Sequence, residues 1–145
     1  MSNKKKLFVM FVLIVSMLVT IAPTPPPPDK LPGGCTPGYW KNHFPSIGQG
    51  VSVGQAFSNA PAELAGDSLK AALRYHGGSG ELGAARILLR AATASLFNSY
   101  FLYFPMSTGQ VISATNAALA SGSRSTMLSL ASTLDGYNNI GCPLN

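Results

Sequence analysis

The sequence predicts an all-α fold: a small bundle of about four helices with a long N-terminal loop, closed by one disulfide bond. The first observation is the stretch 81–100, ELGAARILLRAATASLFNSY, whose apolar residues leave almost no continuous polar face, as in a helix buried on most sides. The second is a series of helix caps and stops with no credible strand pair and no internal repeat. The third is a pair of cysteines, Cys35 and Cys142, near the two ends of the predicted domain.

The N-terminal segment 1–22 has the pattern of an export signal. Lys4 to Lys6 precede a 16-residue apolar run, residues 7–22. Ala22 ends a possible small-residue site for cleavage of the signal, but Pro23 directly after it disfavours cleavage. The apolar run is also near the lower length limit for a helix that spans a membrane. Residues 1–22 are therefore interpreted as a signal peptide or a signal anchor. We expect the rest of the chain to be exported, with membrane contact only through this segment if it is uncleaved.

Residues 23–33 form a proline-rich linker, and residues 34–145 form the domain. The prolines of the linker have no backbone N–H group to donate, so the linker favours a polyproline II helix with a rise of ~3 Å per residue. Such a segment is typical of a semi-rigid stalk. From Asp29 onward, seven Lys and Arg stand against five acids, a net charge of about +2. This scattered excess carries no basic stripe and argues against nucleic acid as a partner.

The first half of the domain contains the most distinctive passage, CTPGYWKNH at 35–43. We expect a short helical turn before Phe57, a second turn over 61–64, and a helix over 68–76 that Asp67 caps and Gly77 ends. Ser79 is the expected cap of the central helix. The two arginines of that helix, Arg86 and Arg90, are candidates for an anionic ligand, but we expect ion pairs with Glu81 or Asp135 and bonds to helix-end carbonyls instead.

The second half predicts two further helices. The aromatic run 101–105 ends at a proline and should be an extended connection over the core. Ser107 and Gln110 match a capping box for a helix that Gly122 ends. Ser123 or Ser125 starts the last helix, which Gly136 ends, and the chain then turns back toward Cys35.

The two cysteines suggest a disulfide bond, because the chain is predicted to be exported and they stand at opposite ends of the domain. A bond between Cys35 and Cys142 closes a loop of about 107 residues. From the loss of loop entropy in the unfolded chain, the bond should stabilise the fold by at most roughly 4 to 5 kcal/mol.

The candidate binding residues are consecutive: Tyr39, Trp40, Lys41, Asn42 and His43. An aromatic pair beside hydrogen-bonding groups suits a sugar-stacking or a partner-binding surface. Alternatively, Trp40 packs the N-terminal loop onto the bundle, while Asn42 and His43 bond loop backbone.

Catalytic and metal sites are not indicated. His43 and His76 have no ligand partner three or four residues away, so no metal or other cofactor is expected. None of the serines lies in a nucleophile-elbow motif, which a catalytic serine would require. Most of the acidic residues lie near the predicted starts of helices, where a carboxylate stabilises the helix dipole. The sequence therefore predicts a protein that is not an enzyme.

Three passages, CTPGYWKNH, GAARILLRAATASLFN and ALASGSRSTMLSLASTLDGYNNIGCPL, resemble an uncharacterised family of exported bacterial proteins and domains. The resemblance covers nearly everything from Gly34 to Asn145 and implies export, but no activity and no catalytic residue. Cys35 and Cys142 match the family's terminal cysteines. The segment after His43, FPSIGQG, departs from it, since related sequences often continue with more aromatic and acidic residues.

The function expected from the sequence is that of a non-enzymatic extracellular or cell-surface domain in surface structure or protein association. Its partner would be a protein or another envelope component, self-association included. The alternative is a carbohydrate- or cell-wall-binding module that uses Tyr39 and Trp40.

Overall fold

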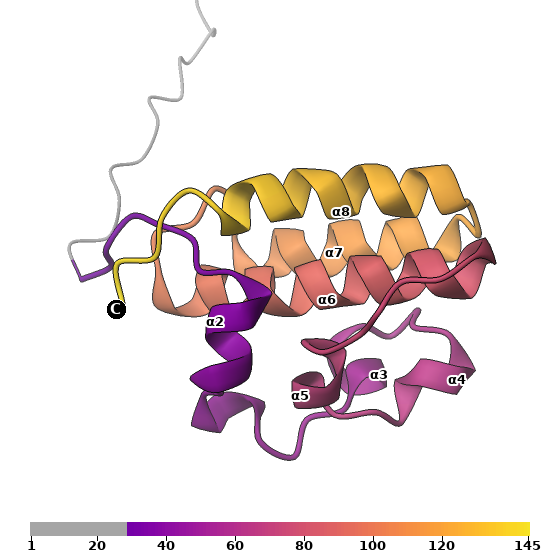
Figure 1. Ribbon diagram of the computed structural model, residues 1–145, viewed down its shortest axis with the longest axis horizontal. Coiled ribbons are helices and arrows are strands. Elements are labelled where there is room, and N and C mark those ends of the chain that lie inside the picture. Colours follow the sequence, from indigo (N-terminus) through magenta and orange to yellow (C-terminus); the bar gives the residue numbers. More distant parts are fainter. Residues whose placement is uncertain (1–28) are drawn as a thin grey trace, which may run out of the picture.

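Helices make up most of the domain (Figure 1). The computed structural model describes residues 29–145. This part of the chain contains isolated β-bridges but no strand, and its helices are α2 (Pro37–Asn42), the 3-10 helix η1 (Ser46–Gly48), α3 (Val53–Ala56), α4 (Ala62–Ala65), α5 (Leu69–Ala72), α6 (Gly80–Phe101), α7 (Thr108–Ala120) and α8 (Arg124–Asn138). The predicted all-α class is confirmed.

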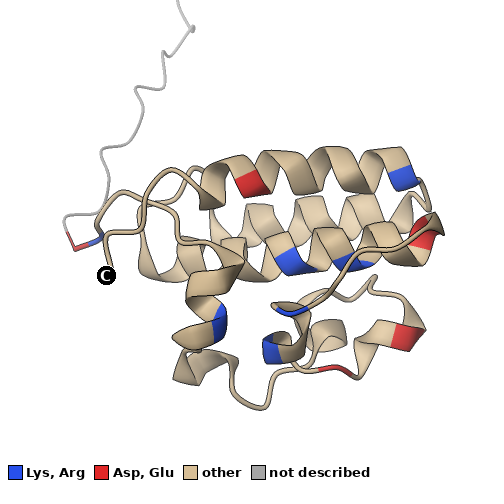
Figure 2. Ribbon diagram, viewed as in Figure 1, with Lys and Arg blue, Asp and Glu red and all other residues tan. Residues whose placement is uncertain are grey.

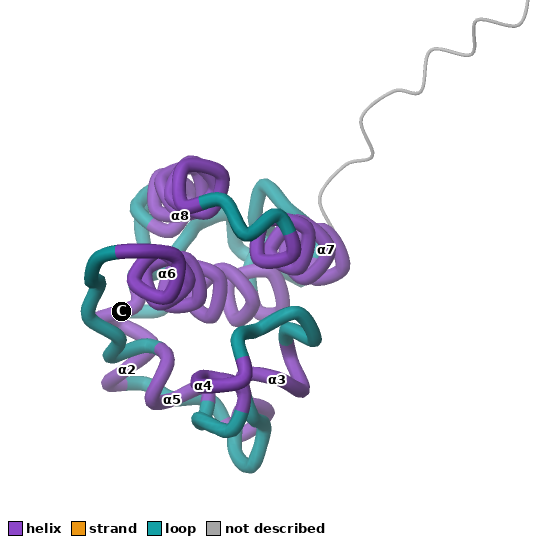
Figure 3. Tube along the Cα trace, turned by 90° about the vertical axis from the view of Figure 1, so that its right-hand side faces the viewer, coloured by secondary structure: helices purple, strands orange, loops and turns teal. Residues whose placement is uncertain are grey.

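The three long helices run along the long axis of the domain. α7 is antiparallel to α6 and α8, because only short connections join the three in order (Figure 1). Seen nearly end-on, they form a triangle, and the short helices α2 to α5 cover the other side of α6 (Figure 3). Helix α6 is therefore enclosed between two groups of helices.

The enclosed position of α6 explains its sequence. A helix packed on both sides needs apolar residues around most of its circumference. Leu88 and Leu89 are fully buried, and Phe97 is almost so. The predicted central helix over 81–100 is confirmed, and it extends one residue further at each end.

Local capping chemistry sets the starts of α7 and α8. The Ser107 amide donates to Gln110 Oε1 at 2.9 Å, and the Gln110 amide donates to Ser107 Oγ at 3.2 Å, which completes the predicted capping box. Ser123 Oγ accepts the Thr126 amide at 3.2 Å, so Ser123 is the cap of α8. That helix continues two residues past Gly136, the predicted stop.

Helix α5 differs from its prediction. Ser68, not Asp67, is its cap, because Ser68 Oγ accepts the Ala71 amide at 3.1 Å. The Asp67 carboxylate instead accepts the Tyr75 hydroxyl at 2.6 Å. The helix ends at Ala72, four residues before the predicted end at residue 76.

The N-terminal part contains more helix than the sequence indicated. Thr36 Oγ1 accepts the Tyr39 amide at 3.2 Å and Pro37 occupies the first helical turn, so the distinctive motif begins a helix, α2. The turns expected before Phe57 and over 61–64 are present as α3 and α4.

The two ends of the described chain are joined. Cys35 and Cys142 form the predicted disulfide bond across a sequence separation of 107. Beside it, the Gly34 amide donates to the Gly141 carbonyl at 2.9 Å. A Cβ at Gly34 would lie 2.1 Å from the Tyr137 carbonyl oxygen, so only glycine allows this approach.

The predicted signal or anchor, residues 1–22, and linker residues 23–28 lie outside the described residues. Among residues 29–145, none of the helices has the length and apolar character needed to cross a membrane.

Reduction of the Cys35–Cys142 bond should lower the stability of the domain by up to about 4 kcal/mol, because the unfolded chain regains the entropy of a long open loop. Chemical denaturation with and without reductant measures this effect. An unchanged midpoint in fully reduced protein would show that the bond contributes nothing.

Substitution of Thr115 by valine should raise the free energy of unfolding by about 1 kcal/mol, because Thr115 Oγ1 is buried without a hydrogen-bond partner among the described residues. Thr93→Val is the matched control, since Thr93 is equally buried but donates to the Leu89 carbonyl at 2.7 Å. Equal effects of the two substitutions on denaturant midpoints would contradict this explanation.

Candidate binding site

The five predicted binding residues lie on or directly after α2, and they do not form one surface. Trp40 is buried, Tyr39 and Lys41 are half-buried, and Asn42 and His43 are exposed. One turn of helix therefore points these side chains in different directions.

Trp40 is only 3% exposed and packs between Phe97 and Phe101, with ring centroids at 5.5 and 5.6 Å. Its Nε1 donates to Asn98 Oδ1 at 2.9 Å. The ring is therefore almost wholly covered and its N–H group is bonded, so the predicted use of Trp40 in an exposed binding surface is wrong. Trp40 instead anchors α2 on the bundle, which was the other interpretation of the sequence.

Tyr39 and His43 contact each other. Their rings stack with centroids 4.2 Å apart and planes inclined by 12°, and His43 Nδ1 lies 3.0 Å from the Tyr39 carbonyl oxygen. The Tyr39 hydroxyl donates to the Leu144 carbonyl at 3.3 Å. These two residues therefore fasten the end of α2 and the C-terminal tail.

A buried hydrogen-bond network lies beneath α2. Asn98 Oδ1 accepts both Trp40 Nε1 and the Cys35 amide, each at 2.9 Å. Its Nδ2 donates to the Cys35 carbonyl at 2.8 Å and to Asn138 Oδ1 at 2.9 Å. Asn138 Oδ1 also accepts the Ser95 hydroxyl, and its Nδ2 donates to the Ala91 carbonyl. The network thus joins the disulfide segment, α2, α6 and α8.

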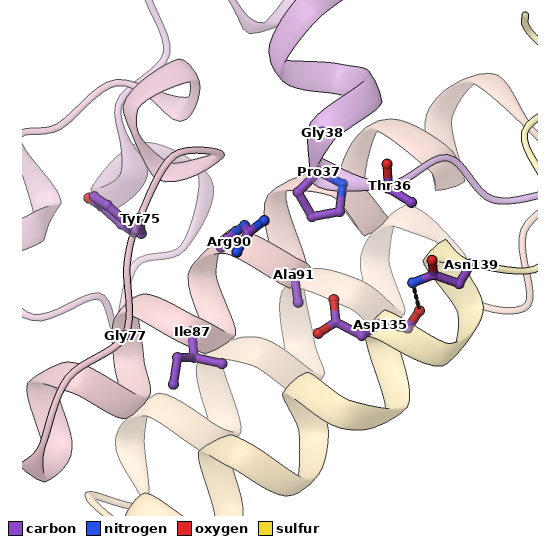
Figure 4. A pocket seen from close by; sticks show the side chains of 10 residues that line it. All are labelled: Thr36, Pro37, Gly38, Tyr75, Gly77, Ile87, Arg90, Ala91, Asp135 and Asn139. Atoms are coloured by element: carbon purple, nitrogen blue, oxygen red, sulfur yellow. Dashed lines mark hydrogen bonds between the residues drawn. The ribbon is translucent and has the colours of Figure 1, made fainter.

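A pocket of about 420 Å³ opens beside this network (Figure 4). We call it the Asp135 pocket, and it is lined by Thr36, Pro37, Gly38, Tyr75, Gly77, Ile87, Arg90, Ala91, Asp135 and Asn139. Arg90 of α6 and Asp135 of α8 lie on either side of Ala91 in this view. The pocket is built from the N-terminal segment at α2, the loop after α5, and the helices α6 and α8.

A second pocket of about 340 Å³, the Lys41 pocket, shares Tyr75 and Arg90 with the first. It is lined by Lys41, Leu73, Arg74, Tyr75, His76 and Arg90. Of the predicted binding residues, Lys41 alone lines either pocket.

Burial dominates the titration of two pocket residues. It raises the pKa of the Asp135 carboxyl above its usual range, while the Arg90 charge and Asn138 oppose that shift. Burial also raises the pKa of Tyr75, with further increases from the hydrogen bond to Asp67 and from the charge of that carboxylate. Tyr75 is therefore a neutral hydroxyl at physiological pH.

The ion pairs expected for Arg86 and Arg90 do not form. In residues 29–145, neither guanidinium lies within 4.0 Å of the carboxylate of Glu81 or Asp135. Arg90 is exposed and lines both pockets. The described part of the chain also has no group of three or more His, Cys, Asp and Glu side chains placed to hold a metal ion.

Exposed aromatic residues gather at the C-terminal end of α6. This terminal aromatic cluster consists of Tyr100, Phe101 and Tyr103, which are 51%, 37% and 42% exposed. Tyr100 and Phe101 pack edge to face at 4.9 Å. Tyr103 is held by backbone bonds, since its amide donates to the Leu31 carbonyl at 2.9 Å. Leu31 is itself 56% exposed, so the apolar surface extends onto the entering chain.

Comparison of the chain with known protein families, with curated proteins and with solved structures gives no match. The function is therefore argued from the geometry of the site.

The sequence reasoning missed Asn98, Asn138 and the pocket residues Thr36, Asp135 and Asn139 as members of a site. A signal for Asn98 was present, because an amide inside an otherwise apolar helix needs buried partners. No comparable signal marks the pocket, which exists only where α2, α6 and α8 meet.

Asn98→Ala should lower the free energy of unfolding by at least about 3 kcal/mol, because it removes the buried partner of the Trp40 indole and of the Cys35 backbone, and one of the buried partners of Asn138. Asn59→Ala is a suitable comparison, since Asn59 makes its bonds to Asn116 at the surface. Similar losses in the two variants, measured by chemical denaturation, would mean that the buried network contributes no more than an exposed one.

Proposed function

We propose that this chain is a non-enzymatic domain that is exported to the cell surface and acts there by protein association, with a second copy of itself as the partner. The terminal aromatic cluster is the observation that carries the proposal. Aromatic side chains are enriched at the centres of protein interfaces, because they supply large contact areas with little loss of side-chain entropy. Tyr100 and Tyr103 also offer hydroxyl groups that pair when buried.

Self-association is favoured by the low net charge. Residues 29–145 carry about +2, so two copies repel each other only weakly. The cluster also lies on backbone that is fixed, since Tyr103 pairs with Leu31 and with Gly33. An interface built on fixed backbone loses little conformational entropy on binding.

The disulfide bond supports the proposed location. Such bonds form and persist in oxidising, non-cytoplasmic settings. Lys4 to Lys6 and the apolar run 7–22 supply the export signal in the sequence. Delivery to the cell surface, with or without an uncleaved anchor, is part of the proposal.

The chemistry of the pockets supports a binding role. Arg90, Asp135 and Tyr75 are the ionisable groups of the Asp135 pocket, and Tyr75 is a neutral hydroxyl bonded to Asp67. A hydrolytic site needs a nucleophile held against a base, and we therefore favour binding over hydrolysis as the role of this pocket.

The carbohydrate alternative requires an exposed Trp40. Its ring is buried and packs against Phe97 and Phe101.

The double substitution Tyr100→Ser with Tyr103→Ser should weaken self-association of residues 29–145 at least about tenfold, because it removes two aromatic contacts from the interface. Sedimentation velocity over a wide range of concentrations measures the dissociation constant.

Ile47→Ser is the control for that experiment, since Ile47 is 43% exposed but lies on η1, away from the cluster. Association should be unchanged in this variant. A wild-type domain that stays monomeric at every concentration, or equal weakening by Ile47→Ser, would overturn the proposal.

A further inference from the structure

The Lys41 pocket concentrates positive charge from three separate elements. Lys41 comes from α2, Arg74 from the loop after α5, and Arg90 from α6, and His76 stands beside them. Figure 2 shows Lys and Arg residues of these elements near the middle of the view. The lining of the pocket contains no carboxylate.

Among residues 29–145 these cations form no salt bridge, although Arg90 is near enough to Asp135 for its charge to lower the pKa of that carboxyl. All five acids of the chain belong to residues 29–145, and none lies within 4.0 Å of Lys41, Arg74 or Arg90. Asp67, the acid nearest to the pocket in sequence, accepts the Tyr75 hydroxyl at 2.6 Å. Like charges gathered around one pocket repel each other, and a bound anion relieves that repulsion.

The adjoining Asp135 pocket offers groups of a different kind. Thr36 Oγ1 accepts the Tyr39 amide and so keeps its own hydrogen for donation. Asn139 Nδ2 donates to the Asp135 carbonyl at 2.7 Å, which leaves Asn139 Oδ1 as an acceptor (Figure 4). The Asp135 carboxylate repels anions but accepts hydroxyl hydrogens. This side of the double pocket therefore suits a neutral body rich in hydroxyl groups.

We propose that the two pockets together bind an anionic saccharide, that is, a phosphate or carboxylate group carried on a polyhydroxyl body. The anion lies between Lys41, Arg74 and Arg90, because guanidinium groups bind both anions with paired hydrogen bonds. The hydroxyl groups face Asp135 and Asn139. This site goes beyond the proposed function and does not use the terminal aromatic cluster.

Calorimetric titration of the full chain in mild detergent tests the proposal with three probes: glucose 1-phosphate, glucuronic acid and glucose. One or both of the anionic sugars should bind saturably, and glucose at least about tenfold more weakly, because it lacks the charge that the cations hold. The first two probes distinguish phosphate from carboxylate. Absence of saturable binding by both anionic sugars, or equal binding of glucose, would overturn the proposal.

Arg90→Gln and Arg74→Gln should each weaken binding of the anionic sugar about tenfold, and both positions are exposed, so the variants are expected to fold. Lys70→Gln is the matched control, because it removes one positive charge from an exposed position on α5, four residues before Arg74, but Lys70 lines neither pocket. Equal weakening by Lys70→Gln would show a diffuse electrostatic effect and overturn the site. The Tyr100→Ser, Tyr103→Ser variant should bind the sugar unchanged, which separates this test from that of self-association.

Discussion

The side chain of Asn98 uses all of its hydrogen-bonding capacity inside the core, and the arrangement of the N-terminal half depends on it. Its two donors and its oxygen meet the Cys35 backbone, the Trp40 indole and Asn138. A buried amide is costly unless each of these positions is satisfied, and the three partners come from three different segments. The amide therefore fixes one relative position of α2, α6 and α8.

The short helices need this fixed position, because isolated helices of four to six residues are not stable in water. α2 is held by Trp40 in the core, by the disulfide bond before its cap, and by the Tyr39 bond to the tail. Its side chains line the double pocket only because these contacts seat it on α6. The contacts that hold α2 on α6 thus also form the pocket.

The sequence predicted those parts of the structure that depend on local pattern. The central helix could be predicted because a helix buried on both sides needs apolar residues around most of its circumference. The capping box of Ser107 could be predicted because its two partners are three residues apart in the sequence. The disulfide followed from the placement of only two cysteines.

The candidate site was predicted less well, because it depends on residues far apart in the chain. The sequence left open whether Trp40 binds a ligand at the surface or anchors the N-terminal loop, because its partner Asn98 is 58 residues away. Arg90 was expected to pair with Glu81 or Asp135, and it instead lines the same pocket as Asp135 without a salt bridge. Such positions are set by tertiary packing, which no local pattern specifies.

The joining of the two chain ends has a mechanical consequence. The chain enters the domain at residues 30–35, where Lys30, Gly33 and Gly34 bond to Ser99, Tyr103 and Gly141, and it leaves through Cys142. Tension applied between residues 29 and 145 is therefore transmitted through the disulfide bond and never across the helices. A pull between these two ends therefore does not stretch the core of the bundle.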